Sequence, residues 1–188
     1  MQAPKNTPPR PGPGRRTEIA MTARVADWIG ARVQGTTRVN MFRAIGRARR
    51  TFLPWMAYSS SLMPFGKLPR TESELIILRV AALREAHYEL DHHRTFGKRA
   101  GLSTAEIAAV QKPEHGFTGR VGALLDAVDD LVARRQLTDE VWTRLRPHID
   151  DAELTALLLL VTNYDGLATV LDVLDVPLDP PRRARRRR

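Results

Sequence analysis

The sequence predicts an all-α fold, and three observations support this. Ala, Leu, Arg and Glu, which favour helices, are abundant in the 188 residues, whereas aromatic residues make up only 6%. Apolar residues recur at helical spacing in several segments. No segment shows a convincing alternation of apolar and polar side chains, which is the pattern of a half-buried strand. We therefore expect a domain built from helices alone.

The periodicity of apolar residues predicts the helices, and capping residues set several of their ends. The predicted helices run over residues 17–33, 39–50, 71–83, 88–100, 103–111, 121–134, 138–146 and 150–174. Ser103 with Glu106, and Asp150 with Glu153, have the spacing of capping boxes. Gly101 is expected to end the helix that precedes it. Residues 52–65 are the most aromatic part of the chain, and a proline there suits a first helical turn.

The segment after Thr71 predicts a helix that is buried on nearly all sides. Its apolar residues leave no wide polar face: Leu75, Ile76, Leu78, Val80, Ala82 and Leu83. Thr71 and Glu74 also have the spacing of a capping box. Glu74 is therefore expected either to complete this cap or to take part in chemistry.

The net charge of +9 comes from the two ends of the chain. Residues 1–16 carry four basic residues and no acid, and residues 181–188 carry six arginines. Of the 30 basic residues, 20 remain between them, against 21 acidic residues. We expect a helical domain over 17–180 between disordered tails, which are rich in Pro and Arg at the start and in Arg at the end. Nucleic acid would bind only through the charge of the Arg-rich tail, and a solvated tail is the preferred interpretation.

Cysteine is absent from the sequence. This excludes disulfides, thiolate metal sites and thiol-based peroxidase chemistry. The N-terminus has no apolar segment of the kind found in signal peptides. The longest apolar run, Leu157–Val161, is far shorter than the ~20 residues that cross a bilayer. We expect a cytoplasmic protein that is not embedded in a membrane.

Most of the candidate chemistry lies in residues 71–101. This stretch holds His87, His92, His93, Glu74, Glu85, Glu89 and Asp91. Glu89 and His93 are four residues apart and share a helix face, so they form a candidate proton-transfer pair. The same spacing is common in ordinary surface pairs, which contribute ~0.2–0.5 kcal/mol. No metal is expected, because the H-E-x-x-H order and an evident third ligand are both missing.

The order of motifs in this stretch is similar to that of a known family. The chain reads E-L-I-I-L-R-V from Glu74, then Y-E-L-D-H-H from Tyr88, then A-G-L-S-T-A-E-I from Ala100. This resembles the carboxymuconolactone decarboxylase family, in the AhpD-like superfamily, with its E-L-x-I-L-R-V, Y-E-W-x-x-H and A-G-L-S/T-x-x-E-I motifs. The resemblance covers roughly residues 38–176 and implies an AhpD-like helical bundle.

The resemblance also distinguishes two branches of the superfamily. The peroxidase branch carries C-x-x-C-x-x-x-H, and its two cysteines correspond here to Ala86 and Glu89, its histidine to His93 and its upstream glutamate to Glu74. Because both thiols are missing, the resemblance implies a cofactor-independent lyase that acts on a small carboxylated lactone or related organic acid. It implies His93 as proton donor, Glu89 as the group that orients the ring, and Glu74 as a second acid or base. Fifteen residues separate the two glutamates, so they meet only if the helix breaks, and 84–86 is the expected place.

Further expectations concern the substrate and the assembly. Tyr88 and Arg79 are expected to contact the substrate, with Arg84 and Arg94 as other candidates for its carboxylate. The family likeness implies a homo-oligomer, a trimer or a hexamer. The alternative function is a non-catalytic or differently acting AhpD-like protein, because Leu90 stands where the family usually has tryptophan.

Overall fold

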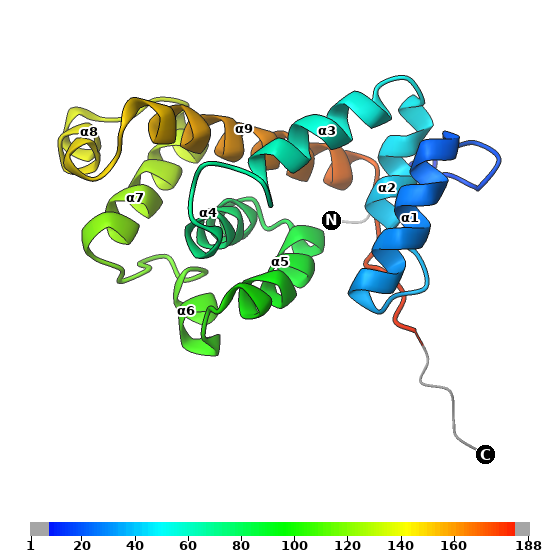
Figure 1. Ribbon diagram of the computed structural model, residues 1–188, viewed down its shortest axis with the longest axis horizontal. Coiled ribbons are helices and arrows are strands. Elements are labelled where there is room, and N and C mark those ends of the chain that lie inside the picture. The colour runs from blue at the N-terminus through cyan, green and yellow to red at the C-terminus, as the bar shows by residue number, and fades with distance from the viewer. Residues whose placement is uncertain (1–7, 183–188) are drawn as a thin grey trace, which may run out of the picture. The chain divides into compact units, whose positions relative to one another are not determined.

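The computed structural model describes residues 8–182, and over this range it contains helices and no β-strand (Figure 1). The α-helices are α1 (Met21–Gln34), α2 (Asn40–Ile45), α3 (Phe52–Leu62), α4 (Arg70–Leu83), α5 (His87–Ala100), α6 (Thr104–Ala109), α7 (Gly119–Arg134), α8 (Asp139–Leu145) and α9 (Asp151–Val173). Short 3-10 helices follow α2 (Gly46–Ala48) and α8 (Arg146–His148). The all-α prediction is confirmed.

Contacts between Cα atoms divide the chain into two compact units. Of the described residues, the first unit comprises 8–55 and 170–182, and the second comprises Met56–Thr169. The two boundaries fall within α3 and within α9. The extent of the helical domain, expected over 17–180, stays a prediction.

In the first unit, α1 approaches α2 and the 3-10 helix after it closely, because glycines lie at these contacts. A Cβ atom added at Gly46 would lie 2.5 Å from the Cβ of Ala23, and one added at Gly30 would lie 2.9 Å from Cε2 of Phe42. One face of α1 is therefore buried in this contact. Large apolar side chains on α1 remain exposed: Met21, Val25, Trp28, Ile29 and Val33.

The N-terminal tail differs in part from the expectation of disorder. Residues 1–7 lie outside the described residues, but 8–16 follow a defined path in the first unit. The backbone N–H of Gly12 donates to the carbonyl of Leu174 at 3.0 Å, and that of Gly14 donates to the carbonyl of Arg43 at 3.1 Å. These hydrogen bonds satisfy backbone groups of the proline-rich segment, and its composition alone does not predict them.

Asn40 holds the C-terminal segment in the same unit. Its side-chain amide donates to the carbonyls of Pro177 and Leu178, and its backbone N–H donates to Oδ1 of Asp179 at 2.7 Å. Asn40 is fully buried, so these bonds satisfy polar groups that have lost contact with water. Of the Arg-rich tail, residues 183–188 lie outside the described residues.

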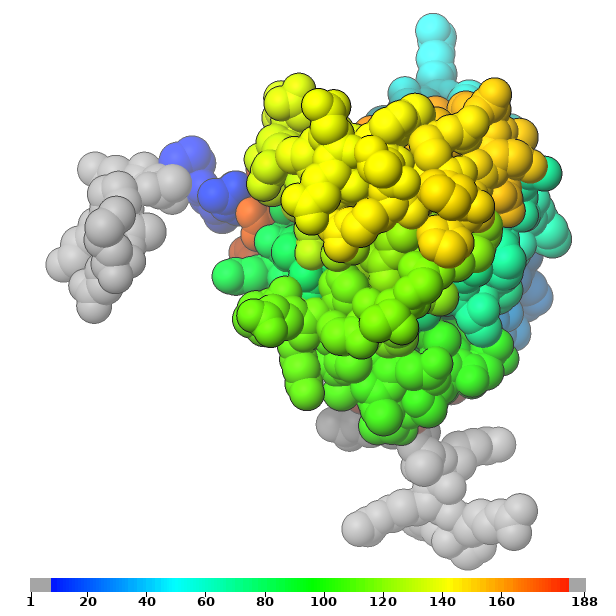
Figure 2. Space-filling model, turned by 90° about the vertical axis from the view of Figure 1, so that its left-hand side faces the viewer, coloured from blue at the N-terminus to red at the C-terminus, as the bar shows by residue number. Residues whose placement is uncertain are grey.

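The second unit is arranged around α4. Nine consecutive residues of this helix, from Ser73 to Ala81, are buried, as its apolar pattern predicts. It lies against α5 and α7 (Figure 1). Figure 2 shows one face of this unit, with α8 and the start of α9 (yellow) at the top and α6 (green) near the bottom.

Helix ends follow the predicted caps with one exception. The boxes Ser103–Glu106 and Asp150–Glu153 form, and Gly101 ends α5 with φ of 107°. The box expected for Thr71 and Glu74 is wrong, because α4 starts earlier, after Pro69, and no side chain caps it. The carboxylate of Glu74 instead turns into the second unit.

Helix α9 is long and apolar enough to cross a membrane by length and composition alone. Its mean hydropathy is 1.5 over the most apolar window, of which 33% is buried. Its buried residues recur every three or four positions: Leu157, Leu160, Val161, Tyr164, Leu167, Ala168 and Leu171. This spacing is that of a helix with one buried face, which the core helix of a globular protein also shows.

Candidate active site

The site depends on a sharp turn between α4 and α5. Helix α4 ends at Leu83 and α5 begins at His87, so the predicted break at 84–86 is confirmed. Glu85 adopts a left-handed conformation with φ of 52°, and the N–H of Ala86 donates to the carbonyl of Ala81 at 2.8 Å. The chain reverses here, which allows side chains of the two helices to meet.

Glu74 of α4 and His93 of α5 form a buried pair. Nδ1 of His93 lies 2.7 Å from Oε2 of Glu74, and both residues are buried. Nη2 of Arg70 lies 2.7 Å from Oε1 of Glu74, close enough for an ion pair although not aligned as a hydrogen bond. An ionised carboxylate only accepts hydrogen bonds, so Nδ1 of His93 is the donor in this contact. Nε2 is then the nitrogen left to exchange a proton.

Glu89 is buried without a hydrogen-bond partner for its carboxyl group. Only 3% of the residue is exposed, and neither side-chain oxygen has a partner. Burial raises the pKa of Glu89 to about 7, against smaller opposing effects of its own backbone and of His92. The role expected for Glu89, orienting His93, is therefore wrong: Glu74 orients the ring from the neighbouring helix. The raised pKa of Glu89 places the ionisation of its carboxyl group near neutral pH.

Aromatic rings surround His93. Its ring meets the ring of Tyr164 edge-on, with centroids 5.2 Å apart, and that of Phe96 with centroids 5.6 Å apart. Burial raises the pKa of Tyr164 well above its usual range, and the negative charges of Glu74 and Glu89 add to this effect. These rings limit the access of water, which strengthens electrostatic effects at the imidazole.

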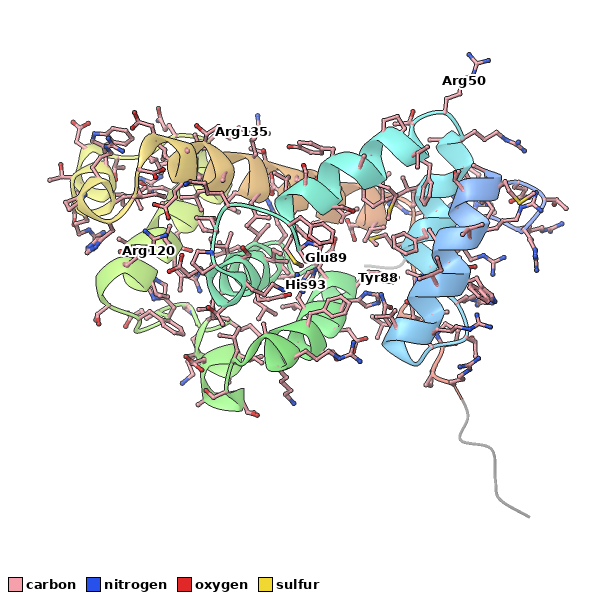
Figure 3. The ribbon with its side chains drawn as sticks, in the orientation of Figure 1. Arg50, Tyr88, Glu89, His93, Arg120 and Arg135 are labelled. Carbon is pink, nitrogen blue, oxygen red and sulfur yellow. The ribbon has the colours of Figure 1, made fainter. Side chains whose placement is uncertain are left out.

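Tyr88 lies at the start of α5, next to Glu89 in the chain. Figure 3 shows Tyr88, Glu89 and His93 near one another, with Glu89 and His93 close to α4. The ring of Tyr88 is 4.4 Å from that of His92, and Tyr88 is only 5% exposed. The structure thus brings together Glu74, Glu89 and His93, with Tyr88 beside them.

Arg79 does not fit its expected role in substrate binding. Its guanidinium donates to both carboxylate oxygens of Asp129, and also to the carbonyls of Val110, Lys112 and Pro113. The side chain is 3% exposed, so no donor is presented to a substrate. Its function is to join α4 to α7 and to the loop after α6.

The other two candidate arginines are also engaged within the protein. Arg84 pairs with Asp165 and donates to the carbonyl of Val132, and Arg94 donates to Oε1 of Gln111 at 2.5 Å.

Arg70 is the arginine that sequence reasoning missed. Its Nη1 is buried and has no hydrogen-bond partner, next to the ion pair of its Nη2 with Glu74. The i,i+4 spacing of Arg70 and Glu74 was a usable signal, since such residues share a helix face. Among residues 8–182, no group of three or more His, Asp or Glu side chains is placed to hold a metal ion.

A family model matches the part of the chain that carries these residues. Residues 51–129 match the carboxymuconolactone decarboxylase family. The match includes Arg70, Glu74, Glu89 and His93, and it confirms the resemblance seen in the sequence. A comparison with curated proteins finds no match.

Solved structures with the AhpD-like fold match over nearly the whole chain. An alkylhydroperoxidase AhpD core protein from Ralstonia eutropha has a TM-score of 0.78 at 16% identity and covers 92% of this chain and 94% of its own. A peroxidase-related protein from a Silicibacter species has a TM-score of 0.74 at 14% identity, covering 90% and 93%. The debrominase Bmp8, in complex with 2,3,4-tribromopyrrole, has a TM-score of 0.73 at 13% identity, covering 93% of each chain. These likenesses establish the fold.

Proposed function

We propose that the protein is a cofactor-independent lyase, because residues 51–129 match the carboxymuconolactone decarboxylase family and the chain has an AhpD-like fold. It removes carbon dioxide from a small carboxylated lactone or a related organic acid. The observation that carries the proposal is Glu89, a buried carboxyl group whose pKa is raised to about 7, one helical turn from His93. A general acid is most effective when its pKa lies near the working pH.

The proposed reaction needs a proton but no redox partner. The bond between the substrate carbon and its carboxylate breaks, carbon dioxide leaves, and the electron pair moves into the conjugated lactone carbonyl. Neutral Glu89 then delivers its proton to carbon, and the ionised carboxylate recovers a proton from water through Nε2 of His93. Positioned proton transfer of this kind contributes roughly 10²–10⁴-fold in rate.

Arg70 is proposed to hold the substrate carboxylate until it leaves. Its buried Nη1 has no partner in the protein, and its Nη2 is fixed beside Glu74. A guanidinium donates strong, directed hydrogen bonds to a carboxylate. Tyr88, next to Glu89 on α5, is also proposed to contact the substrate.

Thiol chemistry is not part of the proposal, because the sequence contains no cysteine. The remaining alternative is an AhpD-like protein that does not catalyse this reaction. The debrominase neighbour acts within the same fold on a different class of small molecule. Fold alone therefore does not choose the substrate.

The test is the release of carbon dioxide from carboxymuconolactone by the purified protein. Glu89→Gln and His93→Gln should each lower kcat by roughly 10²–10⁴-fold, because each removes a step of the proton transfer. Arg70→Gln should act mainly by raising KM, because it removes a substrate contact.

Two residues on the same helix give matched controls. His87 and Asp91 are exposed, so His87→Gln and Asp91→Asn should keep wild-type rates. The proposal is rejected if Glu89→Gln and His93→Gln both turn over at wild-type rates. It is also rejected if the wild type releases no carbon dioxide from any of a panel of carboxylated lactones and β-keto acids.

The proposal includes a homo-oligomer, a trimer or hexamer, in the cytoplasm. Exposed apolar residues in and after α3 support self-association: Leu53 is 58% exposed and Phe65 is 81% exposed. Light scattering should give a mass well above that of one chain, and a monomer would contradict the assembly.

A further inference from the structure

The first unit contains a cleft of about 640 Å³ whose lining is rich in arginine. Arg16, Arg24, Arg38 and Arg43 line it, together with Asp27 and Trp28. The volume lies in the range of small-molecule sites in proteins. No residue that lines the cleft belongs to the unit that carries Glu74, Glu89 and His93.

The charges of this lining are strongly unbalanced. Asp27 is its only acid, and one oxygen of its carboxylate already accepts from the backbone N–H of Val39 at 2.6 Å. Four arginines therefore share the lining with a single acid. Clefts lined by one sign of charge concentrate ligands of the opposite sign.

Two of the four guanidinium groups are fixed by bonds from Nε. Nε of Arg38 donates to Oδ1 of Asn40, and Nε of Arg43 donates to the carbonyl of Gly14, each at 3.0 Å. Since Asn40 is fully buried, the first of these bonds has a rigid acceptor. Groups held in this way lose little conformational freedom when a ligand binds.

Arg24 supplies a donor that the protein leaves unused. Its Nε is buried and has no hydrogen-bond partner in the described chain. A buried donor without an acceptor is costly, and an anion that accepted from it would remove that cost.

The cleft also has an apolar wall, which α1 supplies. Met21, Val25 and Trp28 contribute to the lining and are 64%, 51% and 58% exposed. The guanidinium carbon of Arg32 lies 3.5 Å from the ring centroid of Trp28 and covers that ring. Close packing of α1 on α2 through Gly30 and Gly46 leaves these side chains on the open side of the helix.

We propose that this cleft binds a small organic anion that carries at least two negative charges on a planar apolar body. The arginines would hold the charged groups, either carboxylates or phosphate, and the apolar wall would contact the body. This inference does not depend on the chemistry proposed for Glu89 and His93.

The test is calorimetric titration of the full-length protein with phthalate and with phenyl phosphate, which separate a carboxylate from a phosphate ligand. Arg16→Gln and Arg24→Gln should each weaken binding of the preferred probe roughly tenfold, and the double variant more, because each removes a charged hydrogen-bond donor. Neither change breaks a bond described within the protein, and Arg16 is exposed, so that variant should fold.

Arg50 provides the matched control in the same unit. It is exposed, and Figure 3 shows it pointing away from the helices. Arg50→Gln should bind both probes as the wild type does. The inference is overturned if neither probe binds saturably or if Arg50→Gln weakens binding as much as Arg24→Gln does. It is also overturned if the double variant keeps wild-type affinity, or if a single-stranded oligonucleotide competes at lower concentration than either probe.

Discussion

Glu74 and His93 lie nineteen positions apart on different helices, yet Oε2 of Glu74 is 2.7 Å from Nδ1 of His93. The turn at 84–86 makes this contact possible. The contact with Glu74 orients the imidazole ring of His93 and engages Nδ1, so Nε2 is the ring nitrogen that remains for proton transfer.

Glu74→Gln should therefore lower activity without unfolding the protein. The amide no longer favours a proton on Nδ1, so the imidazole loses its preferred tautomer and its orientation. We expect a loss of roughly 10²-fold or more in kcat with a small change in KM. Steady-state kinetics would show this, and circular dichroism would check the fold. An unchanged kcat would show that Glu74 does not position His93.

Glu89 should make the stability of the protein depend on pH. Its pKa in the folded state is raised to about 7 from 4.5, so between these values the folded state binds more protons than the unfolded state. Stability therefore falls as pH rises through this window, by an amount on the order of 3 kcal/mol. Urea denaturation at several pH values should show this fall, and Glu89→Gln should remove it. The exposed Asp91→Asn is the control and should keep the wild-type profile.

Arg79→Met should destabilise the second unit strongly. The substitution leaves Asp129 and three backbone carbonyls without the guanidinium that they share. Buried acceptors left without a partner cost about 1–3 kcal/mol, whereas Asp129, whose side chain is 35% exposed, can be solvated by water. Thermal denaturation measures this loss, and Arg135→Met, at an exposed position labelled in Figure 3, should cost far less. If both substitutions lowered the melting temperature equally, Arg79 would not stabilise the contact of α4 with α7 and the loop after α6.

Two glycines in helical segments should respond to alanine in opposite directions. A Cβ at Gly46 would lie 2.5 Å from the Cβ of Ala23, so Gly46→Ala should destabilise the protein by about 1–3 kcal/mol. Gly166, within α9, has no atom within 4 Å of its added Cβ. Gly166→Ala should stabilise by about 0.5–1 kcal/mol, because alanine loses less entropy in a helix. Denaturation midpoints would compare them, and a shift in the same direction for both would contradict the described packing.

The sequence predicted the helices well because their signals are local. Capping boxes such as Ser103–Glu106, and a glycine such as Gly101, act within a few residues of the helix end that they set. The box at Thr71 failed because α4 starts at Arg70, and because the carboxylate of Glu74 contacts Arg70 and His93 instead of the backbone at the helix start. The spacing of residues within one segment does not show that a carboxylate has another hydrogen-bond partner elsewhere in the fold.

The sequence predicted which residues form the candidate site, but it did not predict the role of each residue. Spacing indicated Glu89 and His93 as a pair, and the resemblance added Glu74 and implied that Glu89 orients the ring of His93. The chain reversal gives that task to Glu74. Arg79 was misplaced because a sequence does not tell which arginine is buried against an acid fifty residues away. Order in 8–16 depends on backbone bonds to distant residues, which composition does not encode.

The most direct test of the central claim is the titration of Glu89 itself. Carbon-13 NMR of the protein labelled at glutamate side-chain carboxyl groups reports each ionisation, and Glu89→Gln assigns the signal. The account predicts one glutamate carboxyl with a midpoint near pH 7 that is absent from the variant. A Glu89 signal that titrates near 4.5, like an ordinary glutamate, would contradict it.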